Sequence, residues 1–324
     1  MARPWDQAAA TFRSDLLAAV DGDVLKELHV IRPWRHVAVV LRQLLVLAAA
    51  VIATVLWGDR WYVWIPCSIV IGFVVFSFSV LLHEVVHNVA LRDRRSRWNR
   101  VLGHLYAFPS GLSATQFTRW HLDHHDNLGT DDGDPKRHYL TPKIVRRWFK
   151  ALYFTPALFP IYFRAARRAG ATYPDDLRRK IRNERRLAIG FHLAVPLVLW
   201  LGLGRPDLAL KLHLIPVFVV FPVAFALNRL GQHYDIDPAD PAKWGTVIRP
   251  SPYLWDVAYL WSNYHVEHHY FPKVPFYNLP RLHQALGGFF AERGMRKRTY
   301  GGLLFDWLVR NRVPHTRWSD QPAG

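Results

Sequence analysis

Three short histidine-rich stretches decide how this sequence is interpreted: His83-Glu84-Val85-Val86-His87, His121-Leu122-Asp123-His124-His125 and His265-Val266-Glu267-His268-His269. We call them boxes one, two and three; together they hold eight of the 17 histidines. On a helix, residues four positions apart share a face, and residues at i, i+3 and i+4 form a compact patch. Box one therefore predicts a face with two imidazoles, and boxes two and three each predict a face with three.

This number of imidazoles indicates a metal centre. Imidazole suits iron, zinc and copper better than magnesium or calcium. Zinc takes about four ligands and iron at most about six, so the eight box histidines are too many for one ion. We expect two ions. A ninth candidate ligand is His233, which follows Asn228-Arg229-Leu230-Gly231-Gln232; the alternative is an interfacial histidine that binds no metal.

Four apolar segments predict transmembrane helices, because a hydrocarbon core about 30 Å thick needs roughly 20 helical residues. They cover residues 37–57, 61–82, 187–203 and 212–230, and the third is the shortest. Short turns at residues 58–60 and 204–207 join them in pairs. The predicted fold class is an all-α integral membrane protein with four transmembrane helices in two hairpins. A cytoplasmic helical cap would hold the two-metal site.

These spans divide the chain into five parts: a cytoplasmic N-terminal segment (1–36), a first hairpin (37–82), a loop with boxes one and two (83–186), a second hairpin (187–230) and a cap with box three (231–324). Basic residues beside a membrane favour its cytoplasmic side. Basic residues are concentrated at the two ends of the loop: Arg92, Arg94, Arg95, Arg97 and Arg100 at one end, and Arg178, Arg179, Lys180, Arg182, Arg185 and Arg186 at the other. The opposite face has only Arg60, Arg205 and Lys211. We therefore expect both termini and the metal site to be cytoplasmic, in what we interpret as a bacterial cytoplasmic membrane.

Residues 149–163 are apolar and aromatic but are interrupted by Pro156 and Pro160. The segment is too short to span, so we expect it to lie in the membrane interface. With this assignment an even number of spans separates box two from box three. All three boxes are then predicted to lie on one face of the membrane.

Polar and aromatic residues near the boxes are candidates for supporting roles. An outer carboxylate or amide orients a ligating imidazole, and we assign this role to Glu84, Asp123, Asp131, Asp134, Asn228, Asn263 and Glu267. The run Asp131-Asp132-Gly133-Asp134 equally fits a solvated turn, which Asp-Gly favours. Candidates for lining a substrate channel are Trp120, Trp261 and Tyr264, although packing is the alternative role. No catalytic side chain beyond the metal centre is predicted.

Composition restricts the partners. The net charge of +17 would suit nucleic acid, but the long apolar segments make an anionic membrane surface the better partner, so no nucleic acid is expected. Box one also matches His-Glu-x-x-His, the zinc metalloprotease signature. A protease needs only one further ligand and gives no reason for two His-x-x-His-His boxes, so an intramembrane zinc protease remains a distant alternative.

From about residue 80 to residue 285 the chain resembles the membrane fatty acid desaturase and hydroxylase superfamily. The resemblance rests on the boxes, on Trp98-Asn99-Arg100-Val101-Leu102-Gly103, and on His268-His269-Tyr270-Phe271-Pro272-Lys273-Val274-Pro275-Phe276. Box two, extended from Arg119-Trp120 to Leu128-Gly129, is similar to the sphingolipid desaturase branch. The end of box three also resembles carotenoid ketolases and bacterial hydrocarbon oxygenases.

The resemblance implies a non-haem di-iron centre with O2 as co-substrate. The implied iron ligands are His83, His87, His121, His124, His125, His265, His268 and His269, with His233 as the isolated extra histidine. Some family members place an asparagine four residues before that histidine. Arg229 occupies this position here, Asn228 is one step away and Asn263 is only a weak substitute. Whether His233 or an asparagine-bound water completes the metal shell stays open.

The resemblance implies oxidation of a lipid acyl chain, with desaturation of an acyl-lipid or acyl-CoA as the first expectation. Hydroxylation, ketolation and oxidative decarboxylation are the alternatives on the same scaffold, and a metal carrier or sensor is a non-enzymatic one. The sequence lacks the His-Pro-Gly-Gly motif of a fused cytochrome b5 domain. We therefore expect a separate electron donor of the ferredoxin, rubredoxin or cytochrome b5 type.

Overall fold

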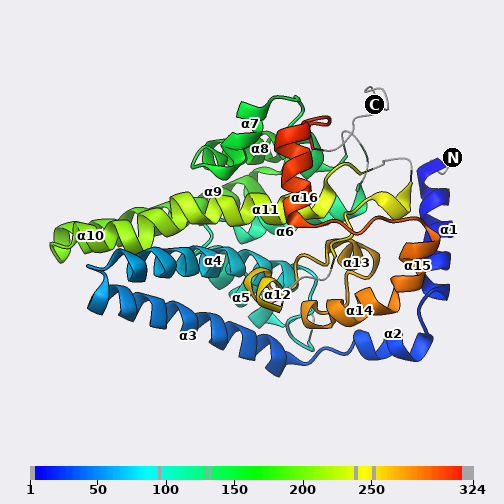
Figure 1. The fold of residues 1–324 in the computed structure, drawn as a ribbon, viewed down its shortest axis with the longest axis horizontal. Coiled ribbons are helices and arrows are strands. Elements are labelled where there is room, and N and C mark those ends of the chain that lie inside the picture. Colours follow the sequence, from blue (N-terminus) through cyan, green and yellow to red (C-terminus); the bar gives the residue numbers. More distant parts are fainter. Residues whose placement is uncertain are drawn as a thin grey trace. The chain divides into compact units, whose positions relative to one another are not determined.

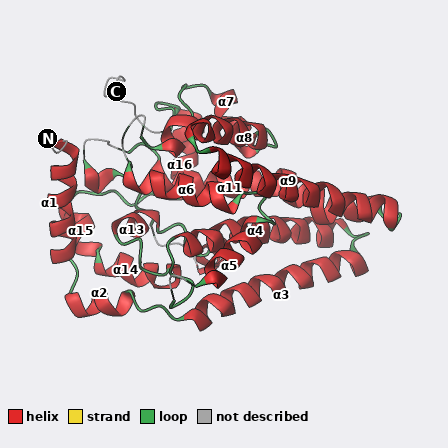
Figure 2. Cartoon of the chain, turned by 180° about the vertical axis from the view of Figure 1, so that it is seen from behind, coloured by secondary structure: helices red, strands yellow, loops and turns green. Residues whose placement is uncertain are grey.

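The computed structural model describes residues 4–93, 96–128, 130, 133–236, 240–249 and 253–315. Within these residues the chain consists of helices and loops (Figure 2), with one isolated bridge between Ile248 and Arg298. This confirms the predicted all-α class. The chain forms two compact units: a spanning unit, Arg32–Arg119 and Leu152–Ala226, and a histidine unit, Met1–Ile31, Trp120–Ala151 and Leu227–Gly324. The five-part division predicted from the sequence stays a prediction.

Four helices among the described residues are long and apolar enough to cross a membrane, as predicted. They are α3 (Pro33–Trp57), α4 (Trp61–Val86), α9 (Asp175–Leu197) continued by η4 (Val198–Gly202), and the run of α10 (Pro206–Ala209), η5 (Leu210–Leu214), η6 (Pro216–Val220) and α11 (Phe221–His233). The third helix has 28 residues, against 25 and 26 for the first two, so it begins well before the apolar segment that was predicted as the shortest span. Hydropathy detects only the apolar second half of this helix. The helix begins earlier, because the Arg, Lys and Glu residues that precede the apolar half are strong helix formers.

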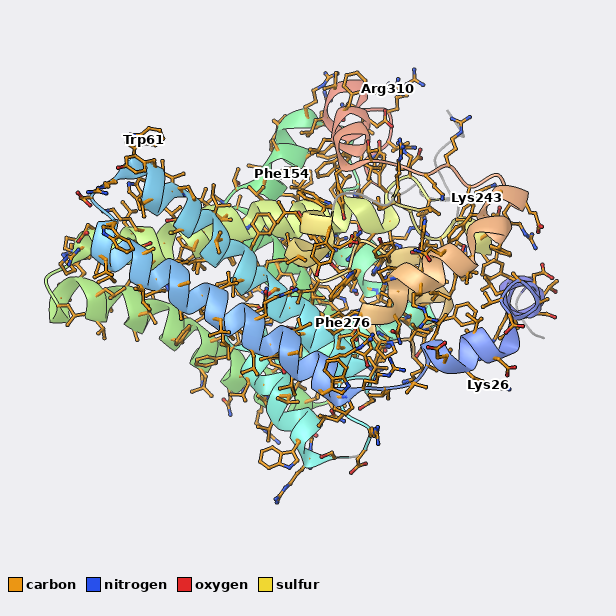
Figure 3. The ribbon with its side chains drawn as sticks, turned by 60° about the horizontal axis from the view of Figure 1, so that its bottom comes forward. Lys26, Trp61, Phe154, Lys243, Phe276 and Arg310 are labelled. Carbon is orange, nitrogen blue, oxygen red and sulfur yellow. The ribbon has the colours of Figure 1, made fainter. Side chains whose placement is uncertain are left out.

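Close packing holds the spanning helices together. Helices α3 and α4 run side by side (Figure 1), and the buried Gln43 amide donates to Ser77 Oγ over 2.8 Å. A Cβ at Gly72 in α4 would lie 2.4 Å from Cβ of Val220, so glycine allows α4 and η6 to approach closely. The labelled Trp61 begins α4, and its exposed side chain points away from the helices (Figure 3). The pairing into hairpins and the cytoplasmic side stay predictions.

The segment predicted to lie in the interface contains no span-length helix. It is divided into α7 (Arg147–Ala151), the short turn η2 (Leu152–Phe154) and α8 (Leu158–Ala169). Twelve residues of α8 are too few to cross a bilayer. Its interfacial location stays a prediction. The spanning unit also contains α5 (Arg97–Ala107), the beginning of α6 (Ala114–Asp126) and the turn η3 (Gly170–Thr172).

The histidine unit is built from short helices around a core of Phe276, Leu282 and Phe290, all of them fully buried. Asn278 Nδ2 donates to the Leu28 carbonyl over 2.8 Å and so attaches the start of α14 to the end of α2. Besides α7 and the ends of α6 and α11, its elements are α1 (Pro4–Ala18), α2 (Gly22–Leu28), η1 (Lys136–Leu140), η7 (Pro241–Lys243), α12 (Tyr253–Tyr259), α13 (His265–Tyr270), η8 (Phe276–Asn278), α14 (Leu279–Ala285), α15 (Gly287–Glu292), α16 (Tyr300–Leu304) and η9 (Phe305–Arg310).

Candidate metal centre

The histidine unit brings two sets of imidazoles together, and each set takes residues from both box two and box three. A four-histidine group consists of His124, His233, His265 and His269, whose donor atoms all lie within 4.8 Å of one another. A three-histidine group consists of His121, His125 and His268, whose donor atoms also lie within 4.8 Å of one another. The ninth candidate, His233, is therefore placed among box histidines.

The predicted three-imidazole faces are divided in a regular way. In boxes two and three, the i and i+4 histidines belong to one group, and the i+3 histidine belongs to the other. A helix turns about 100° per residue, so positions i+3 and i+4 lie on opposite sides of position i, about 100° apart. One ion therefore does not bind all three histidines of a box. Helices α6 and α13 therefore each contribute to both groups.

Outer partners fix which ring nitrogens face the four-histidine group. Nδ1 of His124 lies 2.7 Å from a carboxylate oxygen of Asp134, and Nδ1 of His233 lies 2.7 Å from the Trp244 carbonyl oxygen. Both oxygens only accept, so each Nδ1 carries the hydrogen and each neutral ring has a bare Nε2. The two Nε2 atoms are 3.0 Å apart. Two lone pairs at this distance repel each other unless a cation lies between them.

The remaining distances in this group suit metal ligation. Nε2 of His265 lies 2.9 Å from Nε2 of His233 and 3.0 Å from Nε2 of His269. For a metal–nitrogen bond of about 2.1 Å, two ligands at right angles are about 3.0 Å apart. The observed spacings are thus those of adjacent ligands on one ion.

Burial keeps these imidazoles in the form that binds metal. Burial lowers the pKa of His124, against the opposing effect of the Asp134 carboxylate. Burial and the neighbouring histidines lower the pKa of His269 well below its ordinary value. A ligating imidazole must be neutral. Both rings therefore stay neutral near pH 7.

The three-histidine group has a different outer partner. Nε2 of His125 lies 3.1 Å from Nε2 of His268, whereas Nδ1 of His121 lies 2.8 Å from Nζ of Lys136. Burial lowers the pKa of Lys136 to about 7, and Arg229 acts in the same direction against Asp134. Lys136 was not predicted from the sequence. Its only signal is its position two residues after Asp134.

Box one belongs to the spanning unit. His83 lies in the last turn of α4 and His87 is the residue that ends this helix, with ring centroids 4.8 Å apart. Glu84 is buried, and its carboxylate lies 3.6 Å from Nδ1 of His83. The predicted two-imidazole face is therefore present.

The candidate supporting residues have different outcomes. Asp134 contacts His124 as described above, and Asp131 lies outside the described residues. Asp123 is half-buried. Glu267 pairs with His283 Nδ1 at 2.5 Å, so its contact is with α14 and not with a box imidazole.

The two asparagine candidates also bond to residues other than ligands. Asn228 accepts from Ser262 Oγ over 2.8 Å, and Asn263 donates to Asp256 over 2.9 Å. Sequence reasoning missed Asp256, which also accepts from Tyr264 Oη at 3.1 Å. No motif surrounds Asp256, and only the fold brings it to these partners.

The three aromatic candidates are packed in the histidine unit. Trp120 and Tyr264 are buried, and the Trp261 ring lies 5.4 Å from that of Phe276. Their channel-lining role stays a prediction. Outside the boxes, His104 is half-exposed and lies 3.7 Å from Glu184, which suits a surface residue.

Comparison with known proteins identifies the family. A model of fatty acid desaturases matches residues 59–301, which is most of the chain and includes all three boxes. The chain belongs to the fatty acid desaturase family. This confirms the resemblance seen in the box residues.

Two relatives within this desaturase family illustrate its range. The chain is 28% identical to the chloroplastic omega-3 fatty acid desaturase of Glycine max over 293 residues, covering 83% of this chain and 64% of the relative. It is 30% identical to the sphingolipid delta(4)-desaturase/C4-monooxygenase DES2 of Homo sapiens over 217 residues, covering 64% of this chain and 61% of the relative. The chain thus spans somewhat less than two thirds of these two relatives.

Proposed function

We propose that this desaturase-family chain binds two iron ions and uses O2 to oxidise a lipid acyl chain. The observation that carries the proposal is the pair of bare Nε2 atoms of His124 and His233, 3.0 Å apart. Carboxylate and carbonyl partners on the far side of each ring are typical of ligating histidines. Iron fits this all-imidazole donor set, as do zinc and copper, and family membership favours iron.

The iron ions would supply the oxidising power needed to attack an unactivated C–H bond with O2. The chain's own residues orient and shield the centre. Asp134 and the Trp244 carbonyl hold two imidazoles in the ligating tautomer. Burial of five of the nine proposed ligands, His87, His121, His124, His265 and His268, would exclude water from them.

The ligand set we propose extends to box one. The family resemblance implies that His83 and His87 complete the second group of ligands. Together with the seven histidines of the histidine unit they would give nine imidazoles for two ions. Their shared role is tested by substitution, as described in the Discussion.

Desaturation is the reaction that we propose first. The matched relatives carry the names omega-3 fatty acid desaturase and sphingolipid delta(4)-desaturase. An acyl-lipid or acyl-CoA would be the substrate. Hydroxylation is the second candidate, because the human relative is named as both a desaturase and a C4-monooxygenase.

Electrons would come from a separate protein of the ferredoxin, rubredoxin or cytochrome b5 type. Clustered arginines such as Arg178, Arg179 and Arg182 at the start of α9 would attract such an acidic donor. We also propose that this face and the metal centre are cytoplasmic, following the distribution of basic residues.

Profiling the lipids and hydrocarbons of cells with and without the full chain tests the function. We expect an unsaturated acyl product that depends on the intact chain and disappears in His268→Ala. The matched control is His104→Ala, which removes a half-exposed histidine and should leave the product unchanged. A product that is only hydroxylated favours the second candidate. An unchanged lipid profile contradicts both.

A further inference from the structure

Residues 242–249 form a segment of the histidine unit that contacts a candidate metal ligand, and we call it the connecting segment. Its Trp244 carbonyl oxygen accepts a hydrogen bond from Nδ1 of His233 over 2.7 Å. Two residues further on, the backbone N–H of Thr246 donates to the carbonyl oxygen of Gln232 over 2.8 Å. Gln232 directly precedes His233 in the chain. The backbone of the connecting segment therefore holds both this ligand and its neighbour.

Two further contacts attach the connecting segment to box three. A Cβ at Gly245 would lie 2.9 Å from Cβ of Val266, so glycine allows the segment to lie this close to α13. The hydroxyl of Tyr270, the residue after His269, donates to the Ala242 carbonyl oxygen over 2.6 Å. The connecting segment therefore contacts both α11 and α13, which supply three of the histidines in the four-histidine group.

The connecting segment also pairs with residues 295–298, which lie between α15 and α16 (Figure 1). The backbone N–H of Arg298 donates to the Val247 carbonyl oxygen over 2.8 Å, beside the isolated parallel bridge. At the other end, Sδ of Met295 lies 3.6 Å from the Tyr270 hydroxyl, the same group that donates to the start of the connecting segment. The two segments therefore lie side by side along their length.

Four basic side chains on these two segments are exposed, and we call them the basic patch: Lys243, Arg249, Arg296 and Lys297. Lys243 pairs with Asp240 over 2.9 Å. The three others have no ion-pair partner in the part of the chain that the structure describes. Exposed positive charge of this kind attracts acidic proteins and favours their docking.

The proposed function requires electrons from such a protein. Reducing one O2 to two waters takes four electrons and four protons. Desaturation of an acyl chain supplies two of each, so two electrons must come from a donor and two protons from water. Hydroxylation has the same requirement, because one oxygen atom enters the product and the other becomes water. In either reaction, two reduced donor molecules would each be oxidised by one electron.

We propose that an acidic electron-carrier protein docks on the basic patch and that its electrons reach the metal centre through the connecting segment. The inference rests on the proposed function, because it names the docking site of the separate donor. Lys243 directly precedes Trp244, whose carbonyl oxygen is bonded to His233. The route from the patch to a ligand thus consists of a few covalent bonds and one hydrogen bond. The arginines at the start of α9 would raise the rate of encounter, whereas the patch is the place of contact.

Zero-length crosslinking locates this contact. The purified full chain in detergent would be treated with a water-soluble carbodiimide beside each of three acidic carriers in turn: a ferredoxin, a rubredoxin and the soluble domain of a cytochrome b5. The reagent joins a lysine only to a carboxylate that touches it. We expect crosslinked peptides that contain Lys243 or Lys297 with at least one carrier. Crosslinks confined to other lysines, such as Lys180 in α9, or no crosslink with any carrier, would overturn the proposal.

The affinity of the crosslinked carrier measures the contribution of the patch. Arg296→Glu/Lys297→Glu should weaken its binding at least about tenfold, because like charges across an interface are strongly unfavourable. Arg296→Gln/Lys297→Gln, which only removes the charges, should cause a smaller loss and serves if the first variant does not fold. The matched control is Arg179→Glu/Arg182→Glu, on exposed residues of α9. It changes the net charge equally and should weaken binding about twofold or less at about 0.15 M salt, which screens distant charges.

Unchanged affinity in both patch variants, or equal losses in the patch and control variants, contradicts the proposal. Binding is measured without lipid substrate, whereas the proposed function is tested by its lipid product. The failure of the docking site and the failure of the proposed function are therefore distinguishable.

Discussion

Nδ1 of His124 donates to the Asp134 carboxylate over 2.7 Å, and both side chains are almost completely buried. The carboxylate also accepts the backbone N–H groups of Lys136 and Arg137, at 2.9 and 3.2 Å. Burial by itself would raise the pKa of Asp134, but His124, the Arg137 N–H and the charge of Lys136 hold it below its ordinary value. An ionised, anchored Asp134 therefore directs Nε2 of His124 at the other histidines of its group.

Replacing this carboxylate should weaken metal binding. Asp134→Asn keeps the size of the side chain but removes the charge that orients His124. Loss of such an outer partner typically lowers metal affinity about 10- to 100-fold. Iron per chain, measured by elemental analysis after dialysis, should fall. Asp126→Asn on the exposed end of α6 is the control and should keep its iron; equal iron in both variants would refute the role of Asp134.

Lys136 should affect the other group of histidines. Lys136→Met removes the polar partner of His121 Nδ1 while preserving the length of the buried side chain. We expect about half of the iron to be lost, because the four-histidine group keeps its Asp134 and Trp244 partners. Mössbauer spectra of the remaining iron should show a single site. Loss of all the iron, or of none, would contradict the assignment of Lys136 to one group.

The box-one histidines test whether all three boxes serve one reaction. His83→Ala and His87→Ala should each abolish the acyl product, as we expect of His268→Ala, because we propose that every box supplies ligands. The activity of an intramembrane zinc protease would instead require the box-one histidines and would not change when a box-three histidine is replaced. Side-by-side product analysis of the three variants distinguishes the two, and activity that survives His268→Ala would argue against the two-iron account.

Glu184 should stabilise the beginning of α6. Its carboxylate accepts from Ser113 Oγ, Thr115 Oγ1 and Thr115 N at 2.6, 2.6 and 3.0 Å. Hydrogen bonds to a charged group contribute about 1.5–3 kcal/mol each, so Glu184→Gln should lower stability by about 2 kcal/mol or more. The thermal midpoint in detergent, followed by tryptophan fluorescence, measures this. Glu292 is exposed, so the control variant Glu292→Gln should leave the thermal midpoint unchanged.

Two helix glycines should respond in opposite directions. Gly72→Ala puts a Cβ 2.4 Å from Cβ of Val220 and 2.8 Å from the Pro216 carbonyl oxygen, and such overpacking costs about 1–3 kcal/mol. Gly190→Ala meets nothing within 4 Å and should stabilise α9 by about 0.5–1 kcal/mol. Their thermal midpoints should therefore move down and up. A lower midpoint for Gly190→Ala would contradict this packing.

The box pattern was enough to select the clustered histidines, because spacings of three and four residues act locally along one helix. The pattern could not predict the split between two groups. That split depends on how α6 and α13 pack against each other. His124 belongs to the same group as His269, whereas His125 belongs to the same group as His268. His233 was found only from its place after the fourth apolar segment.

The partners that orient these rings were harder to predict. Asp134 follows box two closely and was selected from its charge, but a backbone carbonyl such as that of Trp244 leaves no trace in a sequence. Nothing in the sequence distinguishes Lys136 from a surface lysine, although the fold buries it. Hydropathy located the four spans but not the start of α9 at Asp175, because a helix continues through charged residues that a hydropathy pattern excludes.

Metal analysis of the purified full chain shows whether the two histidine groups bind two iron ions. Cells would be grown with both iron and zinc available, and metal per chain would be measured by mass spectrometry in the unmodified chain. We predict two iron ions per chain and no stoichiometric zinc. One zinc ion per chain, or no bound metal at all, would contradict the claim that these histidine groups form a two-iron centre.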